Sequence, residues 1–175
     1  MRPNRHSGFT IIELMATIAI AAILLTLAYP SFSDAMQSNR VASATNNLLA
    51  TLAYARSESL RTRSLSTVCS RTDDGENCGV GWTNGILVWT DENRNNALEK
   101  DEIRRILTPP RGIQIVGIGF GYGKLSFDAR GRLSHWWATH TFVVTPLVCK
   151  KGALNVRTIT IAKSGRTDVQ RSACS

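Results

Sequence analysis

A long apolar run near the N-terminus constrains this chain more than any other feature. Between Phe9 and Tyr29 the only side chain that is charged at neutral pH is Glu13, and Pro30 follows. A helix of about 20 apolar residues spans roughly 30 Å, which is the thickness of a bilayer core. We therefore expect residues 9–30 to form a transmembrane helix. A carboxylate inside such a segment needs a partner, so Glu13 is a candidate functional residue.

The charges that precede the run indicate its orientation. Arg2 and Arg5 lie on its N-terminal side, which favours a cytoplasmic N-terminus and a single pass through the inner membrane. Residues 31–175 would then form one periplasmic domain with a core of its own. A secretory signal peptide or a plain anchor also has a basic start and an apolar centre. However, a signal peptide usually has a shorter core and no Glu near its start.

The segment Gly8-Phe9-Thr10-Ile11-Ile12-Glu13-Leu14 resembles the class III signal of type IV prepilins and type II secretion pseudopilins. In that family a short basic leader ends in Gly, and a prepilin peptidase cleaves after it and methylates the new N-terminus. The resemblance implies a leader at residues 1–8, with cleavage after Gly8 and methylation of Phe9. It also implies that Glu13, the fifth mature residue, acts in assembly, where the amine of Phe9 on an adjacent subunit is its expected partner.

Apolar periodicity organises the rest of the chain. Val41, Leu48 and Ala55 recur every seven residues, which predicts an amphipathic helix over 31–63 that continues the membrane helix, with a kink at Pro30. Apolar or alternating runs after this helix predict β-strands. These runs are residues 65–70, 85–90, 103–107, 113–118, 124–127, 141–148 and 154–162.

Three later segments extend the resemblance to the GspH/FimT branch of pilin-like proteins. They are Tyr54–Ser59 and the two Gly-Arg landmarks, Phe127–Arg132 and Lys163–Arg166. The resemblance implies an α+β, type IV pilin-like fold, in which a long N-terminal helix, half membrane-embedded and half amphipathic, packs on antiparallel β-sheets. It implies a minor pilin or pseudopilin that assembles with other pilins or pseudopilins into a type IV pilus or a type II secretion pseudopilus. Which machine it serves stays open.

We do not expect an enzyme, because the residues usual in catalysis show no catalytic pattern. His135 and His140 lie near Ser134 in sequence, but no nucleophile turn accompanies them.

Four cysteines lie in the expected exported domain, and an even number there favours two disulfides. Three pairings are possible. We favour Cys69–Cys78, which closes a short loop, and Cys149–Cys174, which ties down the C-terminus. Four reduced buried thiols are the alternative, and a zinc site is disfavoured because no Cys-x-x-Cys pair is present.

Charge is divided unevenly along the domain. Residues 31–102 hold 7 Lys/Arg and 10 Asp/Glu, whereas residues 103–175 hold 12 Lys/Arg and 2 Asp/Glu. Such asymmetry indicates a polyanionic partner or an acidic neighbouring subunit. Some members of the family capture DNA through a C-terminal Gly-Arg-x-Arg motif, but here the second Arg is replaced by Asp168. The alternative function is therefore a double-stranded DNA receptor in natural transformation. Its candidate contacts are Arg166, Lys163, Arg171, Arg157, Lys150, Lys151 and Arg132.

The acidic segment 91–102 has the oxygen spacing of an EF-hand calcium loop, at positions 1, 3, 5, 9 and 12. Asn96 stands at position 6, where Gly is usual, and no helix precedes the loop. A solvated hairpin loop is the alternative. Calcium is the one cofactor that the sequence raises. Its candidate ligands are Asp91, Asn93, Asn95, Glu99 and Glu102.

Overall fold

One helix, α1 (Ile11–Thr62), dominates the first third of the chain. The computed structural model describes residues 9–120, 123–134 and 139–175, without the side chains of residues 27–31. The predicted leader with Gly8, as well as His135, lies outside the described residues. The chain divides into an N-terminal unit that ends at Gln37 and a larger unit from Ser38 to Ser175.

Residues at each terminus of α1 explain where the helix begins and ends. The hydroxyl of Thr10 accepts the backbone N–H of Glu13 at 3.3 Å, which caps the first turn. At the other end Arg63 has a φ of 53°, in the left-handed region that commonly ends a helix. The helical assignment runs through Pro30, as the sequence predicted. The kink expected there stays a prediction.

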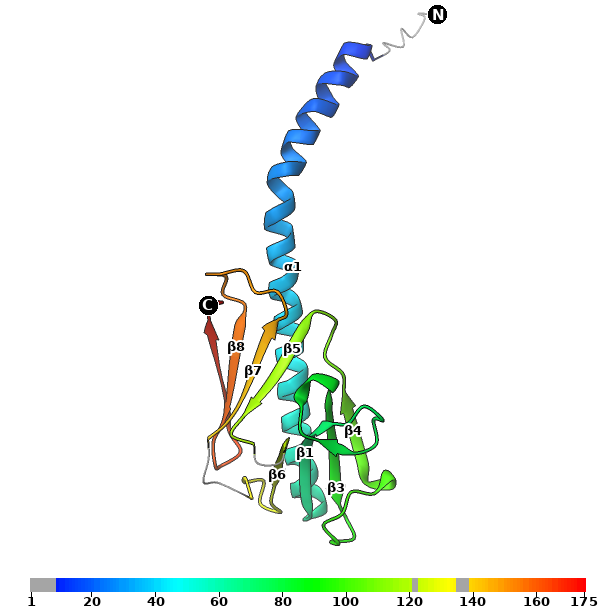
Figure 1. Ribbon diagram of the computed structural model, residues 1–175, viewed down its shortest axis with the longest axis vertical. Helices are drawn as coiled ribbons and strands as arrows, with labels where there is room; N and C mark the ends of the chain where they lie inside the picture. The colour runs from blue at the N-terminus through cyan, green and yellow to red at the C-terminus, as the bar shows by residue number, and fades with distance from the viewer. Residues whose placement is uncertain (1–8, 121–122, 135–138) are drawn as a thin grey trace, which may run out of the picture. The chain divides into compact units, whose positions relative to one another are not determined.

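The first sheet follows the helix and is antiparallel throughout (Figure 1). Its strand order is β2-β1-β3-β4, and β6 also pairs with β1. Two 3₁₀ turns, η1 (Trp82–Asn84) and η2 (Lys100–Glu102), lie next to β3 and β4 in the chain. The strands are β1 (Leu65–Arg71), β2 (Cys78–Gly79), β3 (Ile86–Asp91), β4 (Ile103–Leu107) and β6 (Lys124–Phe127).

The second sheet is also antiparallel, in the order β5-β7-β8-β9. Its last strand lies at the edge and is exposed at five of its six residues. The sequence did not predict β9, because the segment is polar and shows no apolar alternation. The strands are β5 (Ile113–Ile118), β7 (His140–Pro146), β8 (Val156–Ile161) and β9 (Thr167–Ser172).

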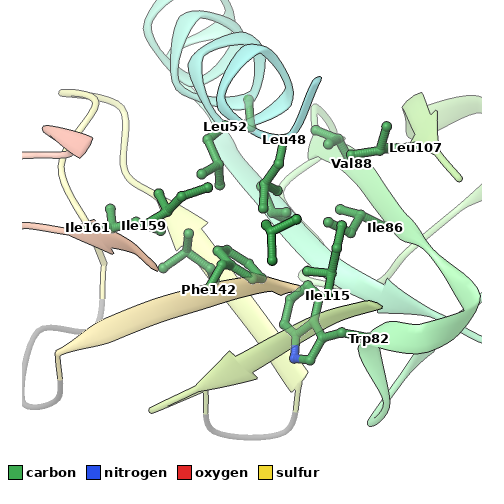
Figure 2. Packing of buried hydrophobic residues seen from close by; sticks show 14 of the residues in the cluster. Leu48, Leu52, Trp82, Ile86, Val88, Leu107, Ile115, Phe142, Ile159 and Ile161 are labelled. Atoms are coloured by element: carbon green, nitrogen blue, oxygen red, sulfur yellow. The ribbon is translucent and has the colours of Figure 1, made fainter. Parts of the chain in front are cut away.

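The core lies between the second half of α1 and both sheets. Figure 2 shows Leu48 and Leu52 of the helix pointing toward Ile86 of the first sheet and toward Phe142 and Ile159 of the second. All five are almost fully buried. Burial of each such side chain contributes roughly 1.5–3 kcal/mol to stability. The predicted α+β fold, a long helix on antiparallel sheets, is therefore confirmed.

Two disulfides hold loops against the sheets. Cys69–Cys78 joins β1 to β2 with the Cα atoms 5.5 Å apart, and Cys149–Cys174 ties the C-terminus to the loop after β7 at 5.6 Å. These are the two pairings that the sequence favoured.

Candidate functional site

The first turns of α1 carry exposed apolar side chains. All side chains from Phe9 to Thr26 are exposed, and those of Phe9 (84%) and Ile11 (80%) are nearly free of contacts within the chain. A helix that is apolar all round is normally buried in a membrane or among other helices. These residues are therefore a candidate interaction surface. In the part of the chain that the structure describes, no helical stretch combines the length and hydropathy needed to cross a membrane.

Glu13 is the acidic residue of the first helical turn. It stands three residues after the capping Thr10, and the partial positive charge of a helix N-terminus favours a carboxylate there. Its side chain is exposed. This gives Glu13 a role within its own helix besides the assembly role that the sequence predicts.

The two Gly-Arg segments lie against each other at one end of the second sheet. The backbone N–H of Leu133, just after the first, donates to the oxygen of Lys163 in the second at 3.0 Å. Gly165 has a φ of 77°, and a Cβ atom on it would lie 2.5 Å from the backbone oxygen of Gly131. The close approach of the two turns therefore requires glycine at Gly165.

Arg56 of α1 joins both turns to the helix. Its Nη1 donates to the oxygen of Gly165 at 3.2 Å. A Cβ on Gly131 or Gly165 would come within 3.1 Å of the Arg56 Nε. That Nε is buried and has no hydrogen-bond acceptor among the described residues. No sequence signal links Arg56 to a turn so far along the chain.

Asp128 holds the first turn closed. Its Oδ1 accepts the backbone N–H groups of Arg130 at 2.8 Å and Arg132 at 2.9 Å. Burial raises the pKa of Asp128, but these two N–H donors and the charge of Arg132 outweigh burial and lower the pKa below its usual value. The aspartate is therefore ionised at neutral pH and organises the turn from which both arginines extend.

The joined turns carry four exposed cations, which we call the basic turn cluster. They are Arg130, Arg132, Lys163 and Arg166. Three were predicted as candidate DNA contacts, and Arg130 was missed because it precedes the glycine of the landmark. The two turns contain a single acidic residue, Asp128. Its Oδ2 lies 3.4 Å from the Nη2 of Arg132 and offsets part of the positive charge. The cluster suits a polyanion or an acidic protein surface.

The remaining predicted contacts lie elsewhere. Arg171 is five residues beyond Arg166 along β9, and Lys150 and Lys151 lie beside the disulfide at the C-terminus. Arg157 is only 5% exposed, and its Nη1 donates to the backbone oxygen of Leu154 at 2.8 Å. The prediction that Arg157 contacts DNA is therefore wrong, because the inward face of β8 buries it.

The register of β9 places Asp168 and Arg171 on opposite faces of the strand. Val169 pairs with the buried Ile159, and Arg171 pairs with the buried Arg157, so both face the helix side of the sheet. Side chains alternate along a strand, and Asp168 therefore points to the opposite face. Burial and, second, the charge of Arg171 lower the pKa of Arg157.

Two hollows lie between α1 and β9 on the helix side. One, of about 420 Å³, is lined by Arg56, Leu60 and Arg166 among others. The second, of about 460 Å³, is lined by Asn46, Leu49, Arg157 and Arg171 among others. Both have arginines among polar and apolar lining residues.

His140 has a structural role. It is 6% exposed, its Nδ1 lies 2.8 Å from the oxygen of Gly119, and its ring stacks on Phe120. Among the described residues, no group of three or more His, Cys, Asp or Glu side chains is arranged to hold a metal ion.

A sequence profile described as "Type II transport protein GspH" matches residues 44–165. This region is more than half of the chain and contains Arg56, the first Gly-Arg turn and the second turn as far as Gly165. The chain belongs to the GspH family. A second profile, described as "Prokaryotic N-terminal methylation motif", matches residues 3–29 and thus includes the predicted cleavage site. No functionally curated protein matches this GspH-family sequence.

This GspH-family chain is similar to solved structures of two pilin-like proteins. The type IV minor pilin FimU of Pseudomonas aeruginosa is 21% identical, with a TM-score of 0.55 over 75% of this chain and 89% of FimU. The minor pseudopilin EpsH from the type 2 secretion system of Vibrio cholerae is 13% identical, with a TM-score of 0.49 over 74% of this chain and 94% of EpsH. At this identity the likeness to FimU establishes the pilin-like fold and not the machine.

Proposed function

We propose that this chain is a minor pilin or pseudopilin, made as a precursor with residues 9–30 in the inner membrane and residues 31–175 in the periplasm. A prepilin peptidase cleaves it after Gly8 and methylates Phe9, and it then joins other pilins or pseudopilins in a filament. One observation carries the proposal, namely the exposed apolar surface of α1 from Phe9 to Thr26. The match to the methylation motif over residues 3–29 supports the processing step.

In this proposal α1 leaves lipid for a bundle of neighbouring helices. Both surroundings are apolar, so the transfer requires specific contacts rather than burial alone. The carboxylate of Glu13 provides one, because the free amine of Phe9 on the adjacent subunit carries the opposite charge. A charge pair of this kind is costly to break once it is buried.

The test is incorporation of full-length variants in a strain that lacks its own copy. Glu13→Gln keeps the size and removes the charge, whereas Glu13→Val also makes the site apolar. We expect both to be cleaved in the membrane and largely absent from sheared filaments. Wild-type recovery of either variant in filaments would contradict the pairing. Deletion tells the machines apart, because loss of surface pili indicates a pilus and loss of protein secretion indicates a pseudopilus.

The basic turn cluster favours a second candidate function, double-stranded DNA capture. Its four cations are exposed on two turns that lie against each other. Because the candidate contacts are on turns and a strand, we expect phosphate contacts without base readout. Binding should therefore be about micromolar or weaker at physiological salt and should weaken steeply as salt rises.

The test is fluorescence anisotropy of the full chain in detergent with a random-sequence duplex at low salt. Lys163→Gln/Arg166→Gln removes two charges from the cluster, and Lys150→Gln/Lys151→Gln removes two from the opposite end of the sheet. We expect the first pair alone to abolish most of the binding. Equal effects of the two pairs would indicate general charge attraction, and no binding by wild type would leave the filament role alone.

A further inference from the structure

The loop between β3 and β4, residues 91–102, begins and ends with a buried carboxylate. Asp91 and Glu102 are each 3% exposed, although the residues between them are mostly exposed. An ionised carboxylate away from water needs hydrogen-bond donors or a cation. The question is therefore which groups satisfy the four oxygens.

The loop folds back over Asp91. The two carboxylate oxygens of Asp91 accept the backbone N–H groups of Asn95 at 3.0 Å and Asn96 at 3.1 Å. Arg94 and Asn96 have φ values of 62° and 59°, so the chain turns sharply at the fourth and sixth positions of the loop. Both oxygens of Asp91 have partners, and the turn at Asn96 stands where a calcium loop needs one.

Glu102, at position 12, is satisfied on one oxygen only. Its Oε1 accepts the backbone N–H groups of Glu92 at 2.8 Å and Asn93 at 3.4 Å, which draws the carboxylate into the opening turn of the loop. Its Oε2 is buried, and no donor among the described residues reaches it. Glu102 is only 3% exposed, so water does not readily supply the missing partner of this oxygen. The unpartnered oxygen therefore points to a cation.

Three more oxygen-bearing side chains meet on the outer side of the loop. The carboxylate of Glu99 lies 3.0 Å from the Asn93 amide nitrogen and 2.7 Å from that of Asn95. The amide oxygens of Asn93 and Asn95 accept the backbone N–H groups of Asn95 at 3.0 Å and Ala97 at 2.8 Å. Each amide oxygen has a second lone pair that can face a cation.

Neighbouring basic residues pair with other acids. Arg104 lies 2.6 Å from Glu92, and Lys100 lies 2.6 Å from Glu76. In the described part of the chain, no ion pair includes any of the three loop acids Asp91, Glu99 and Glu102. Their charge is therefore available to a mobile cation.

We propose that residues 91–102 bind Ca²⁺ through the side chains of Asp91, Asn93, Asn95 and Glu99, with Glu102 contributing both carboxylate oxygens. Among the described residues, Asp91, Glu99 and Glu102 are not arranged to hold a metal ion together, so binding requires the loop to draw these three carboxylates around the ion. A set of six or more oxygen donors on a flexible loop suits Ca²⁺ better than Mg²⁺, which demands a tighter octahedron. With three charged ligands, we expect a dissociation constant on the order of 10⁻⁴ M, in the range of extracellular modules.

Calorimetric titration of the full chain in detergent with CaCl₂ tests the site directly. Glu99→Gln removes an exposed ligand charge with little risk to folding, and Glu102→Gln removes the unpartnered carboxylate. We expect each to weaken Ca²⁺ binding by about tenfold or more, one pair of ligand contacts being worth at least that factor. Asp101→Asn is the matched control, because it removes one exposed charge of the same loop at a position without a ligand role.

Terbium gives a second readout. Trp89 is buried two residues before Asp91, in a small cluster with Leu98 of the loop, and can sensitise the luminescence of a bound lanthanide. We expect terbium emission that Ca²⁺ displaces and Mg²⁺ does not. Absence of both heat and emission at millimolar cation would overturn the proposal. Equal weakening by Asp101→Asn and Glu99→Gln would also overturn it, since that indicates diffuse attraction to an acidic loop.

Discussion

The guanidinium of Arg56 donates a hydrogen bond to the backbone oxygen of Gly165, 3.2 Å away and 109 residues later in the chain. This contact joins the part of α1 that belongs to the larger unit to the turn that carries Arg166. It also places a cation of the helix beneath the basic turn cluster. The second half of the helix therefore supports the turn on which Arg166 stands.

Replacement of Arg56 should loosen the turn. Arg56→Met keeps the aliphatic packing but removes the donor to Gly165, and a hydrogen bond from a charged group contributes about 1.5–3 kcal/mol. We expect a loss of unfolding free energy of that size in urea titrations. Arg40→Met, on an exposed part of the same helix, is the control and should change it by less than about 0.5 kcal/mol.

Gly165 offers a prediction with a matched control. Both Gly165 and Gly112 have left-handed φ values, 77° and 81°, but a Cβ on Gly112 meets nothing within 4 Å. Gly112→Ala should therefore cost only the conformational strain, about 1–2 kcal/mol. Gly165→Ala should cost clearly more, because its Cβ would overlap the oxygen of Gly131. Equal melting temperatures of the two variants would show that the turns separate without cost.

Much of the fold could be predicted from local patterns. The seven-residue recurrence of Val41, Leu48 and Ala55 identified the face of α1 that is buried, and most strands followed from short apolar runs. These features are local, because a residue's burial on a regular element follows from its spacing. The N-terminal methylation motif was likewise readable from sequence, and the profile match over residues 3–29 confirms it. Cleavage after Gly8 stays a prediction.

The rest depended on contacts between distant segments. β9 carries few apolar residues because it lies at an open sheet edge. Its sequence therefore lacks the alternation of apolar and polar residues that predicts a strand. The sequence predicted a strand around Arg157 but not that the arginine lies on its buried face. A charged residue is expected at the surface, so nothing in the sequence indicated this burial. The meeting of Gly131, Gly165 and Arg56 joins three elements and has no local signature.

The disulfides should stabilise the domain unequally. In the chain-entropy treatment, the loop closed by Cys149–Cys174, with a sequence separation of 25, contributes more than that of Cys69–Cys78, with a separation of 9. The estimates are about 3.5 and about 2.7 kcal/mol. Paired Cys→Ala variants should lower the melting temperature in that order. Alkylation of the native chain before reduction should label no thiols, and labelling of all four would contradict both bridges.

The carboxyl group of Asp74 should become protonated only at a pH well below the usual range for aspartate. The Thr72 hydroxyl, the backbone N–H of Glu76 and the side chain of Asn77 donate to it and lower its pKa to about 2 from 3.8. Because the folded value is the lower one, this contribution to stability is full above 3.8 and is lost as pH falls through about 2. NMR titration of the carboxyl carbon should show the low midpoint, and the stabilities of wild type and Asp74→Asn should converge at acid pH. A midpoint near 3.8 would show that these hydrogen bonds do not persist in solution.

Asp168 should oppose any polyanion at the basic turn cluster. It follows Arg166 by two residues and is exposed on the face of β9 away from the helix, so it repels phosphates that approach the turn from that face. At a separation of about 8 Å in water, one such repulsion amounts to roughly 0.5 kcal/mol. Asp168→Asn should therefore tighten duplex binding about two- to threefold at low salt, and the gain should shrink as salt screens it. Asp101→Asn removes the same charge from the β3–β4 loop and should leave the affinity unchanged. If both variants tighten binding equally, net charge governs the interaction and the cluster is not its site. If Asp168→Asn alone tightens it, the phosphates lie beside Arg166.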